Sequence, residues 1–305
     1  MKTMRALAVV LLSAFLSGCI LAPQKPDSPP TQVVEGQASP RAEEPLAPAP
    51  ISTEFILPTQ SVSLVPEWRD FPVVPELSNT ALAIYVRGQE LGNRSHAFSK
   101  IGDGEIATTW FLPPTCNLGP YEELDAVYTY FGGSFERASA AAQAGFNTDR
   151  ILDPAFADAA VCESGESPLA CEVRIHRPAF ALISLGTNQV WQPDAFEDGL
   201  ERILITLIDS GVVPVLSTKG DNLEGDGRIN AIIADLAESY DVPLWNFWAA
   251  IQNLPDQGLQ PDGEHLTWAS CDFGNEDAMT HAWPVRNLTA LQVLQMLMQA
   301  VPAEP

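Results

Sequence analysis

The sequence has little positive charge. It contains 16 lysines and arginines against 39 aspartates and glutamates, and with only four histidines its formal net charge is −23 at neutral pH. A chain this acidic repels phosphate backbones and anionic lipid headgroups. We therefore expect no nucleic-acid partner. The acidic surface can also serve solubility alone.

Long hydrophobic runs are nearly absent. The run from Ala6 to Leu16 follows Lys2 and Arg5, is too short to span a bilayer, and continues into Leu16-Ser17-Gly18-Cys19. This pattern matches a bacterial lipobox. It predicts a lipoprotein signal peptide over residues 1–18, cleaved before Cys19, whose thiol is lipidated. The alternative is an ordinary secretory signal that contains a cysteine. We expect an extracytoplasmic protein, lipid-anchored to a bacterial cell membrane at the cell-envelope surface.

Removal of the signal peptide would leave about 14 basic residues and a net charge of about −25. Residues 19–60 then have no hydrophobic period and are rich in proline (Pro23, Pro26, Pro29, Pro30, Pro40, Pro45, Pro48, Pro50). Such a segment is typical of an extended, disordered tether. Residues 61–305 suffice for a single domain with a sizeable core, because 46% of the chain is apolar.

Cysteines are few, and none forms a Cys-x-x-Cys pair. With Cys19 lipidated, four remain, and an even number outside the cytoplasm suggests disulfides. Cys162 and Cys171 bracket a short loop, which favours that pair and leaves Cys116 with Cys271. Three connectivities remain open on sequence alone. A zinc site is the competing idea, but no histidine stands at ligand spacing, so we expect no metal and no cofactor.

Strand and helix patterns alternate along the domain. Apolar runs predict strands over 97–101, 178–185, 212–217 and 242–247, and amphipathic segments predict helices over 125–131, 135–144, 195–210, 228–240 and 286–301. This alternation predicts an α/β fold with a doubly wound, flavodoxin-like parallel sheet covered on both faces. Ligands bind such sheets beyond the carboxyl ends of the strands.

Four short motifs fall at or near those ends. They are Gly102-Asp103-Gly104, Gly145, Gly186-Thr187-Asn188 and Asp262-Gly263-Glu264-His265. Their order, over residues from about 80 to 301, resembles the SGNH/GDSL hydrolases. Pro243 to Trp248 and Val285 to Thr289 are also similar to a group of bacterial extracellular GDSL-like lipoproteins. The resemblance implies an SGNH-hydrolase-type fold and the hydrolysis of acyl or acetyl esters.

The resemblance also implies a role for each motif. Gly104 stands where the family has its nucleophilic serine, so that position is vacant. Gly145 and Asn188 would form an oxyanion hole, and Asp262 would orient His265 as the general base. Asn188 could instead only hold its own loop, and His265 could pair with Asp262 for packing alone.

Gln189, where many relatives have aspartate, and Glu264 also depart from the pattern without removing a reacting group. Glycine at position 104 has no atom to form an acyl-enzyme, so we expect ester hydrolysis to be impaired. Asp103 would brace the turn. Three rescues are conceivable: a water activated by His265, Glu105 as base or nucleophile, or a displaced hydroxyl from Ser99 on its strand or Ser139 in its helix.

The second hypothesis is a catalytically inactive surface lipoprotein that binds a glycan or another ligand in the same cleft. Aromatic residues near the predicted mouth of the cleft would stack on sugar rings, or would be ordinary half-buried packing residues (Trp110, Trp191, Trp268). A small acidic loop could hold Ca²⁺ or be a solvated turn (Asp221, Glu224, Asp226). The expected partners are thus a small-molecule or glycan ester and, through Cys19, a membrane. The sequence carries no signal for an oligomeric state.

Overall fold

The computed structural model of the protein describes residues 67–302. The predicted signal peptide over 1–18 and the lipidated Cys19 with its tether over 19–60 lie outside the described residues. Across residues 67–302, no helix combines the length and the apolar character that a membrane crossing requires.

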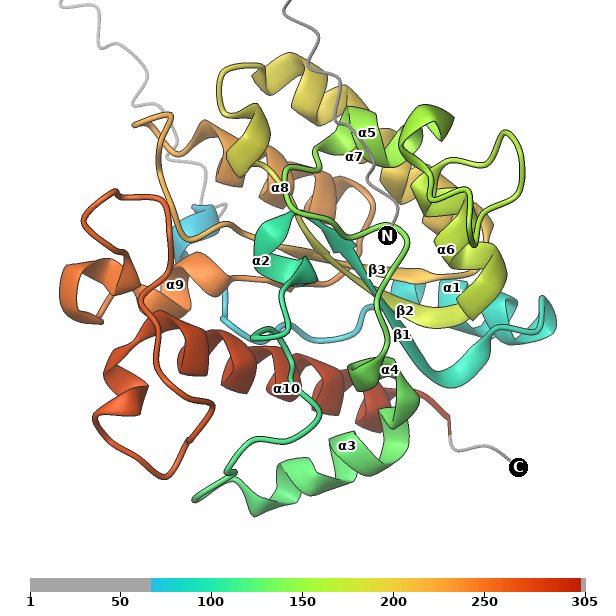
Figure 1. The fold of residues 1–305 in the computed structure, drawn as a ribbon. Helices are drawn as coiled ribbons and strands as arrows, with labels where there is room; N and C mark the ends of the chain where they lie inside the picture. The colour runs from blue at the N-terminus through green and yellow to red at the C-terminus, as the bar shows by residue number, and fades with distance from the viewer. Residues whose placement is uncertain (1–66, 303–305) are drawn as a thin grey trace, which may run out of the picture. The chain divides into compact units, whose positions relative to one another are not determined.

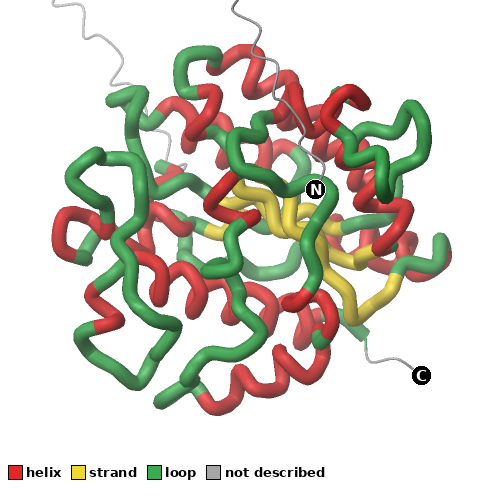
Figure 2. The backbone as a smooth tube through the Cα atoms, viewed as in Figure 1, coloured by secondary structure: helices red, strands yellow, loops and turns green. Residues whose placement is uncertain are grey.

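Helices and strands alternate along the described chain (Figures 1 and 2). The elements are α1 (Asn79–Glu90), β1 (Arg94–Gly102), α2 (Gly104–Ala107), α3 (Asp125–Phe131), α4 (Gly133–Glu136), α5 (Thr148–Leu152), α6 (Pro168–His176), β2 (Pro178–Ser184), α7 (Pro193–Asp209), β3 (Val213–Ser217), α8 (Arg228–Ser239), β4 (Leu244–Trp245), α9 (Phe247–Ile251) and α10 (Ala282–Ala300). Short 3-10 turns lie at Trp68–Asp70, Glu122–Leu124, Pro154–Phe156, Thr187–Gln189, Pro255–Gly258 and Ala278–Thr280.

The four strands form one parallel sheet in the order β1-β2-β3-β4. Their carboxyl ends are in register, because Gly102 pairs with Ser184, Ser184 with Ser217, and Ser217 with Trp245. The segment that follows each strand therefore starts at the same edge of the sheet. This is the edge at which the sequence motifs were expected to meet.

Helices cover both faces of the sheet. On one face, Tyr85 of α1 stacks on Phe180 with ring centroids 5.6 Å apart, and Phe131 of α3 meets Phe98 edge-on at 5.5 Å. On the other face, α6 and α7 pack against β1 and β3. Figure 1 shows α3 and α10 on one side of the strands and α5 to α8 on the other. The predicted α/β fold with a covered parallel sheet is confirmed.

Helix α7 shows why these segments fold as they do. It begins with Pro193, whose fixed φ suits the first helical turn and whose missing N–H needs no partner there. Its buried residues Phe196, Leu200, Ile203 and Leu207 recur every three or four positions and form one apolar stripe. Burying each such side chain contributes roughly 1.5–3 kcal/mol.

The predicted helix over 135–144 is wrong. Helix α4 ends at Glu136, and the alanine-rich run after it extends beside the end of β1 instead. The N–H of Gly102 donates to the carbonyl of Ala141 (3.0 Å), and the N–H of Gln143 donates to the carbonyl of Gly102 (3.1 Å). Tertiary hydrogen bonds override the helix propensity of alanine here. Ser139 is consequently not in a helix.

The sequence predictions missed α1, α2, α5, α6 and α9, of which α1 and α6 are the longest, and overextended one strand. Helices α1 and α6 both begin after a serine, Ser78 and Ser167, whose side chain accepts a hydrogen bond from the first turn. Strand β4 has only two residues, Leu244 and Trp245, where 242–247 was expected. None of these differences moves the carboxyl edge of the sheet.

Candidate functional site

The first motif forms the turn at the end of β1. Gly102 has φ +148°, and a Cβ at this position would lie 1.9 Å from the carbonyl oxygen of Ser184, so only glycine fits. The Oδ1 atom of Asp103 then accepts a hydrogen bond from the N–H of Glu105 (3.1 Å) and caps α2. Asp103 thus braces the turn, and Gly104 is the first residue of α2.

A pocket of about 310 Å³ opens beside this turn. It brings together residues that are far apart in the sequence: Gly104, Gly145, Asn188 and His265 all line it. Three further motif residues also line it (Asp103, Thr187, Glu264). The remaining lining residues lie outside the motifs (Glu105, Thr108, Trp110, Ala144, Gln260, Leu266, Trp283). The segment between α9 and α10, which carries His265, is mostly loop (Figure 2).

The Asp262–His265 pair has the geometry of an oriented imidazole. The Nδ1 atom of His265 lies 2.8 Å from Oδ2 of Asp262, while Oδ1 of Asp262 accepts the N–H groups of Glu264 and His265, each at 3.0 Å. These backbone hydrogen bonds lower the pKa of Asp262 to about 2, so it is a carboxylate at neutral pH. Its hydrogen bond in turn raises the pKa of His265. With Nδ1 donating to Asp262, Nε2 is the basic nitrogen of the neutral ring.

Two donors lie near the vacant position. Within residues 67–302, the backbone N–H of Gly145 donates no hydrogen bond, and this residue lines the pocket. The Nδ2 atom of Asn188 donates to the carbonyl of Phe146 (3.0 Å), which leaves the second hydrogen of that amide. Asn188 therefore both holds its loop and lines the pocket. Gln189 is buried, and its Oε1 accepts the N–H and hydroxyl of Thr148, both at 2.9 Å.

Position 104 has room for a side chain. A Cβ added to Gly104 would meet the Cα and Cβ atoms of Ala144 at 3.8 Å, which is ordinary van der Waals contact. Neither of the hydroxyls considered as replacements lines the pocket: Ser99 is fully buried and donates to Oε1 of Glu172 (2.5 Å), and Ser139 lies outside the lining. Of the described lining residues, only Thr108 and Thr187 carry hydroxyls, and Thr187 donates its own to Asp221 (2.7 Å).

One charged side chain close to Glu105, that of Arg286, was not assigned to the site from the sequence. Arg286 is fully buried among the rings of Phe111, Trp245 and Phe247. Its Nη2 atom donates to Ser184 (2.8 Å), and its Nη1 atom lies 3.8 Å from the carboxylate of Glu105. Within the part of the chain that is described, its Nε and Nη1 atoms have no hydrogen-bond partner.

Burial disfavours ionisation of the two carboxyls on this floor. Together with the neighbouring charge of Glu105, it raises the pKa of Asp103 to about 7, against the opposing effects of the hydrogen bond from the N–H of Glu105 and of Arg286. Burial also raises the pKa of Glu105, while Arg286 and His265 oppose that shift. Both carboxyls are therefore harder to ionise than in water, and a buried guanidinium lies behind them.

Aromatic rings continue the pocket on one side. The ring of Trp110 lies 6.3 Å from that of Trp268 and 5.9 Å from that of Trp283. Trp110 and Trp283 line both the pocket and an adjoining groove of about 260 Å³, to which Trp268 and Cys271 also contribute. Trp191 is 77% exposed and lines neither. Two of the three tryptophans singled out in the sequence thus lie at this cleft.

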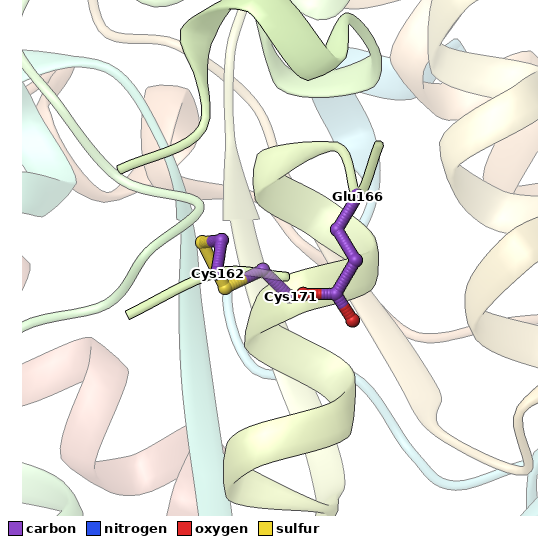
Figure 3. Close-up of side chains that lie close together, drawn as sticks. All are labelled: Cys162, Glu166 and Cys171. Atoms are coloured by element: carbon purple, nitrogen blue, oxygen red, sulfur yellow. A yellow bond between two sulfur atoms is a disulfide. The ribbon is translucent and has the colours of Figure 1, made fainter. Parts of the chain in front are cut away.

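The structure contains two disulfides, Cys116–Cys271 and Cys162–Cys171, which is the pairing that the sequence favoured. In the described part of the chain, one group has metal-ligand spacing, formed by Cys162, Cys171 and Glu166 (Figure 3). Both of its sulfur atoms are in the disulfide, and Glu166 pairs with Arg174 at 2.5 Å. Because both sulfur atoms are oxidised, this group contains no thiolate that could bind zinc.

The acidic loop considered for calcium forms ion pairs with neighbouring cations. Lys219 is buried and donates to Asp221 (2.6 Å) and Glu224 (2.7 Å). Asp226 pairs with Arg228. These carboxylates hold their own loop together.

No protein-family model matches the sequence, and a search of curated proteins finds no match. Solved structures with a similar fold include a GDSL-like lipase from Bacteroides thetaiotaomicron, with 13% identity over 72% of this chain and 98% of that chain at a TM-score of 0.42. The psychrotrophic esterase EstA from Pseudoalteromonas has 12% identity, 66% and 97% coverage and a TM-score of 0.41. An acetylxylan esterase from Geobacillus stearothermophilus has 15% identity, 65% and 93% coverage and a TM-score of 0.41. Because likeness at this level concerns the fold alone, the function is inferred from the side chains of the pocket.

Proposed function

We propose that this protein is an SGNH/GDSL-hydrolase-like lipoprotein whose pocket binds acyl or acetyl esters, with hydrolysis impaired by the glycine at position 104. One observation supports the proposal most strongly. Gly104, Gly145, Asn188 and His265 line the same pocket, and Asp262 holds the imidazole through a 2.8 Å hydrogen bond. The groups implied by the family resemblance are gathered, apart from the reacting hydroxyl.

The remaining groups can still act on an ester carbonyl. The N–H of Gly145 and the amide of Asn188 would stabilise the negative charge that develops on the carbonyl oxygen. Without a serine hydroxyl, no acyl-serine forms, and the route that we propose is direct attack by a water that His265 deprotonates. The imidazolium would then return the proton to the leaving alcohol. This route lacks the fixed nucleophile, so its rate is low.

The site of action would be outside the cytoplasm. The lipobox that ends at Cys19 would anchor the protein, and residues 19–60 would separate the domain from the membrane. The two disulfides support this placement, because disulfides persist in oxidising compartments. The ligand would then be an ester that is present at the cell envelope.

Restoring the missing hydroxyl tests the proposal. Turnover of p-nitrophenyl acetate is compared between the native protein, Gly104→Ser and Gly104→Ala. The alanine variant adds the same Cβ without the hydroxyl and is the matched control. Since position 104 has room for a Cβ, we expect Gly104→Ser to exceed both others in kcat/KM by roughly a thousand-fold or more. Equal rates in the folded serine and alanine variants would contradict the proposal.

The tryptophans favour a second candidate, a catalytically silent glycan-binding site in the same cleft. Trp110 and Trp268 are each 54% exposed and adjoin the pocket, as sugar-stacking rings would. An acetylated xylooligosaccharide, titrated by calorimetry against the native protein and against Trp268→Ala, tests this. Trp191→Ala is the matched control, because that exposed ring lies elsewhere. Binding that Trp268→Ala weakens and Trp191→Ala does not would support the candidate, and equal binding by all three would contradict it.

A further inference from the structure

A second pocket, of about 410 Å³, lies at the other end of β1. Arg94, His96, Arg137 and His176 line it together with Tyr130 and Ser134, and none of the described residues in its lining is acidic. This is unusual in a chain with 39 acidic and 16 basic residues. Two of the four histidines of the protein are gathered here.

The two pockets are well separated. Arg94 is the first residue of the nine-residue strand β1, and Gly102, which precedes the ester pocket, is the last. At about 3.3 Å per residue, the strand places them roughly 26 Å apart. A ligand in the second pocket would therefore be independent of the first pocket, and nothing proposed for the first pocket assigns one.

The arginines of this pocket are held in place by the fold. Nε and Nη2 of Arg94 donate to the carbonyl oxygen of His176 at 2.9 and 2.5 Å. Arg137 donates through Nη1 to Glu172 (2.6 Å) and through Nη2 to the carbonyl of Phe98 (2.5 Å). Arginines fixed in this way lose little side-chain entropy when they bind an anion.

The charges around the pocket are unbalanced. Glu172 is the carboxylate behind it, and it already accepts hydrogen bonds from Ser99, from Arg137 and from the N–H of Ala140. Arg94 makes its hydrogen bonds to a backbone carbonyl, and no carboxylate within residues 67–302 pairs with it. Of the described side chains at this site, two guanidinium groups therefore face one carboxylate.

Burial and the neighbouring arginines both act on two nearby bases. Burial lowers the pKa of His176, and Arg137 and Arg94 lower it further against the opposing effect of Glu172. Burial likewise lowers the pKa of Lys100, with Arg137 as the next cause. An anion in the pocket would relieve the repulsion among these groups.

We propose that this second pocket binds a phosphate-type oxyanion, either inorganic phosphate or the phosphate group of a monoester. Arg94 and Arg137 supply guanidinium groups whose planar donors match such an oxyanion. The hydroxyl of Ser134 accepts from the N–H of Phe98 (3.1 Å), so its own hydrogen can donate to the ligand. The planar donors of two guanidinium groups suit the oxygens of a phosphate group better than those of a single carboxylate.

Calorimetric titration of the full-length chain with inorganic phosphate, and separately with phenyl phosphate, tests the proposal at low ionic strength. We expect saturable binding with one site per chain. Arg94→Gln should weaken it at least tenfold, which corresponds to the loss of about 1.4 kcal/mol. Arg94 is exposed, so the variant should keep its fold, as far-UV circular dichroism would check. Arg202→Gln is the matched control, because it removes an equal charge from an exposed site on α7.

A second variant guards against an indirect effect. Arg137→Lys keeps a positive charge beside Glu172 but loses the guanidinium fork, so it should also weaken binding. Tighter binding of phenyl phosphate than of inorganic phosphate would identify a monoester as the ligand, and equal binding would identify the free ion. The absence of saturable binding of both, or equal affinity in the native, Arg94→Gln and Arg202→Gln proteins, would overturn the proposal.

Discussion

The Gly104 turn and the Asp262–His265 loop meet in one pocket but differ in what they retain. The loop keeps a carboxylate, an imidazole and the 2.8 Å hydrogen bond between them. The turn keeps its backbone, its Asp103 cap and the space for a Cβ, and lacks only a side chain at position 104. The comparison teaches that the scaffold that positions a reaction is separable from the group that performs it.

The two regions are also tied to each other. The disulfide Cys116–Cys271 links the segment that follows the turn to the segment that follows His265. Beside it, the N–H of Asn117 donates to the carbonyl of Cys271 (3.0 Å), and the N–H of Phe273 donates to the carbonyl of Asn117 (2.8 Å). These links hold the two sides of the pocket together whether or not a nucleophile is present.

The largest expected effect is on the loop side. If the loop still provides a competent base, adding His265→Ala to the Gly104→Ser variant should lower kcat for p-nitrophenyl acetate by about 10⁴-fold or more. His281→Ala in the same background is the matched control, because His281 precedes α10 and does not line the pocket. Turnover that survives His265→Ala would show that the two regions do not cooperate.

The next effect concerns the link between the regions. Replacing Cys116 and Cys271 by serine should lower the free energy of unfolding by about 5 kcal/mol, because their sequence separation is 155 residues. The pair Cys162 and Cys171, with a separation of 9, should cost about 3 kcal/mol. Urea denaturation measures both. In the Gly104→Ser background, the loss of Cys116–Cys271 should also lower kcat/KM, whereas the loss of Cys162–Cys171 should not. An equal decrease in kcat/KM in both double variants would show that Cys116–Cys271 has no specific role in holding the pocket.

The smallest effect sharpens the account of the turn. The pKa of Asp103 is raised from 3.8 to about 7, so the native state keeps it protonated where the unfolded chain has ionised it. Stability should therefore fall as the pH rises from about 4 to about 7 and then level off. Asp103→Asn keeps the acceptor for the N–H of Glu105 and removes this cost, stabilising the fold by up to about 4 kcal/mol above pH 7. A stability difference that is constant between pH 4 and pH 8 would contradict this.

The residues of the motifs could be placed at one edge of the sheet because strand patterns are local features of the sequence. Strands β2 and β3 are continuous apolar runs, and parallel strands share a carboxyl edge, so Gly104 and Asn188 were expected near each other. Arg286 and Trp283 were not assigned to the site, because their positions depend on how α10 packs under the turn. No spacing pattern reports such packing.

The helix prediction over 135–144 failed for a related reason. Alanine-rich composition is a local signal, whereas the hydrogen bonds of Ala141 and Gln143 to Gly102 are not. By contrast, α1 and α6 carry readable signals in Ser78 and in Ser167 followed by Pro168, and a closer reading of caps would have found them. Helix caps and apolar runs can be predicted from this sequence, whereas hydrogen bonds between segments far apart in the chain cannot.

The most direct measurement is the reaction of position 104 with a fluorophosphonate, followed by intact-protein mass spectrometry. The reagent labels only a hydroxyl that a base activates beside an oxyanion hole. The account predicts one phosphonyl adduct per chain in Gly104→Ser and none in the native protein or in Gly104→Ala. A correctly folded Gly104→Ser variant that gains no mass would contradict the claim that this pocket is intact apart from its nucleophile.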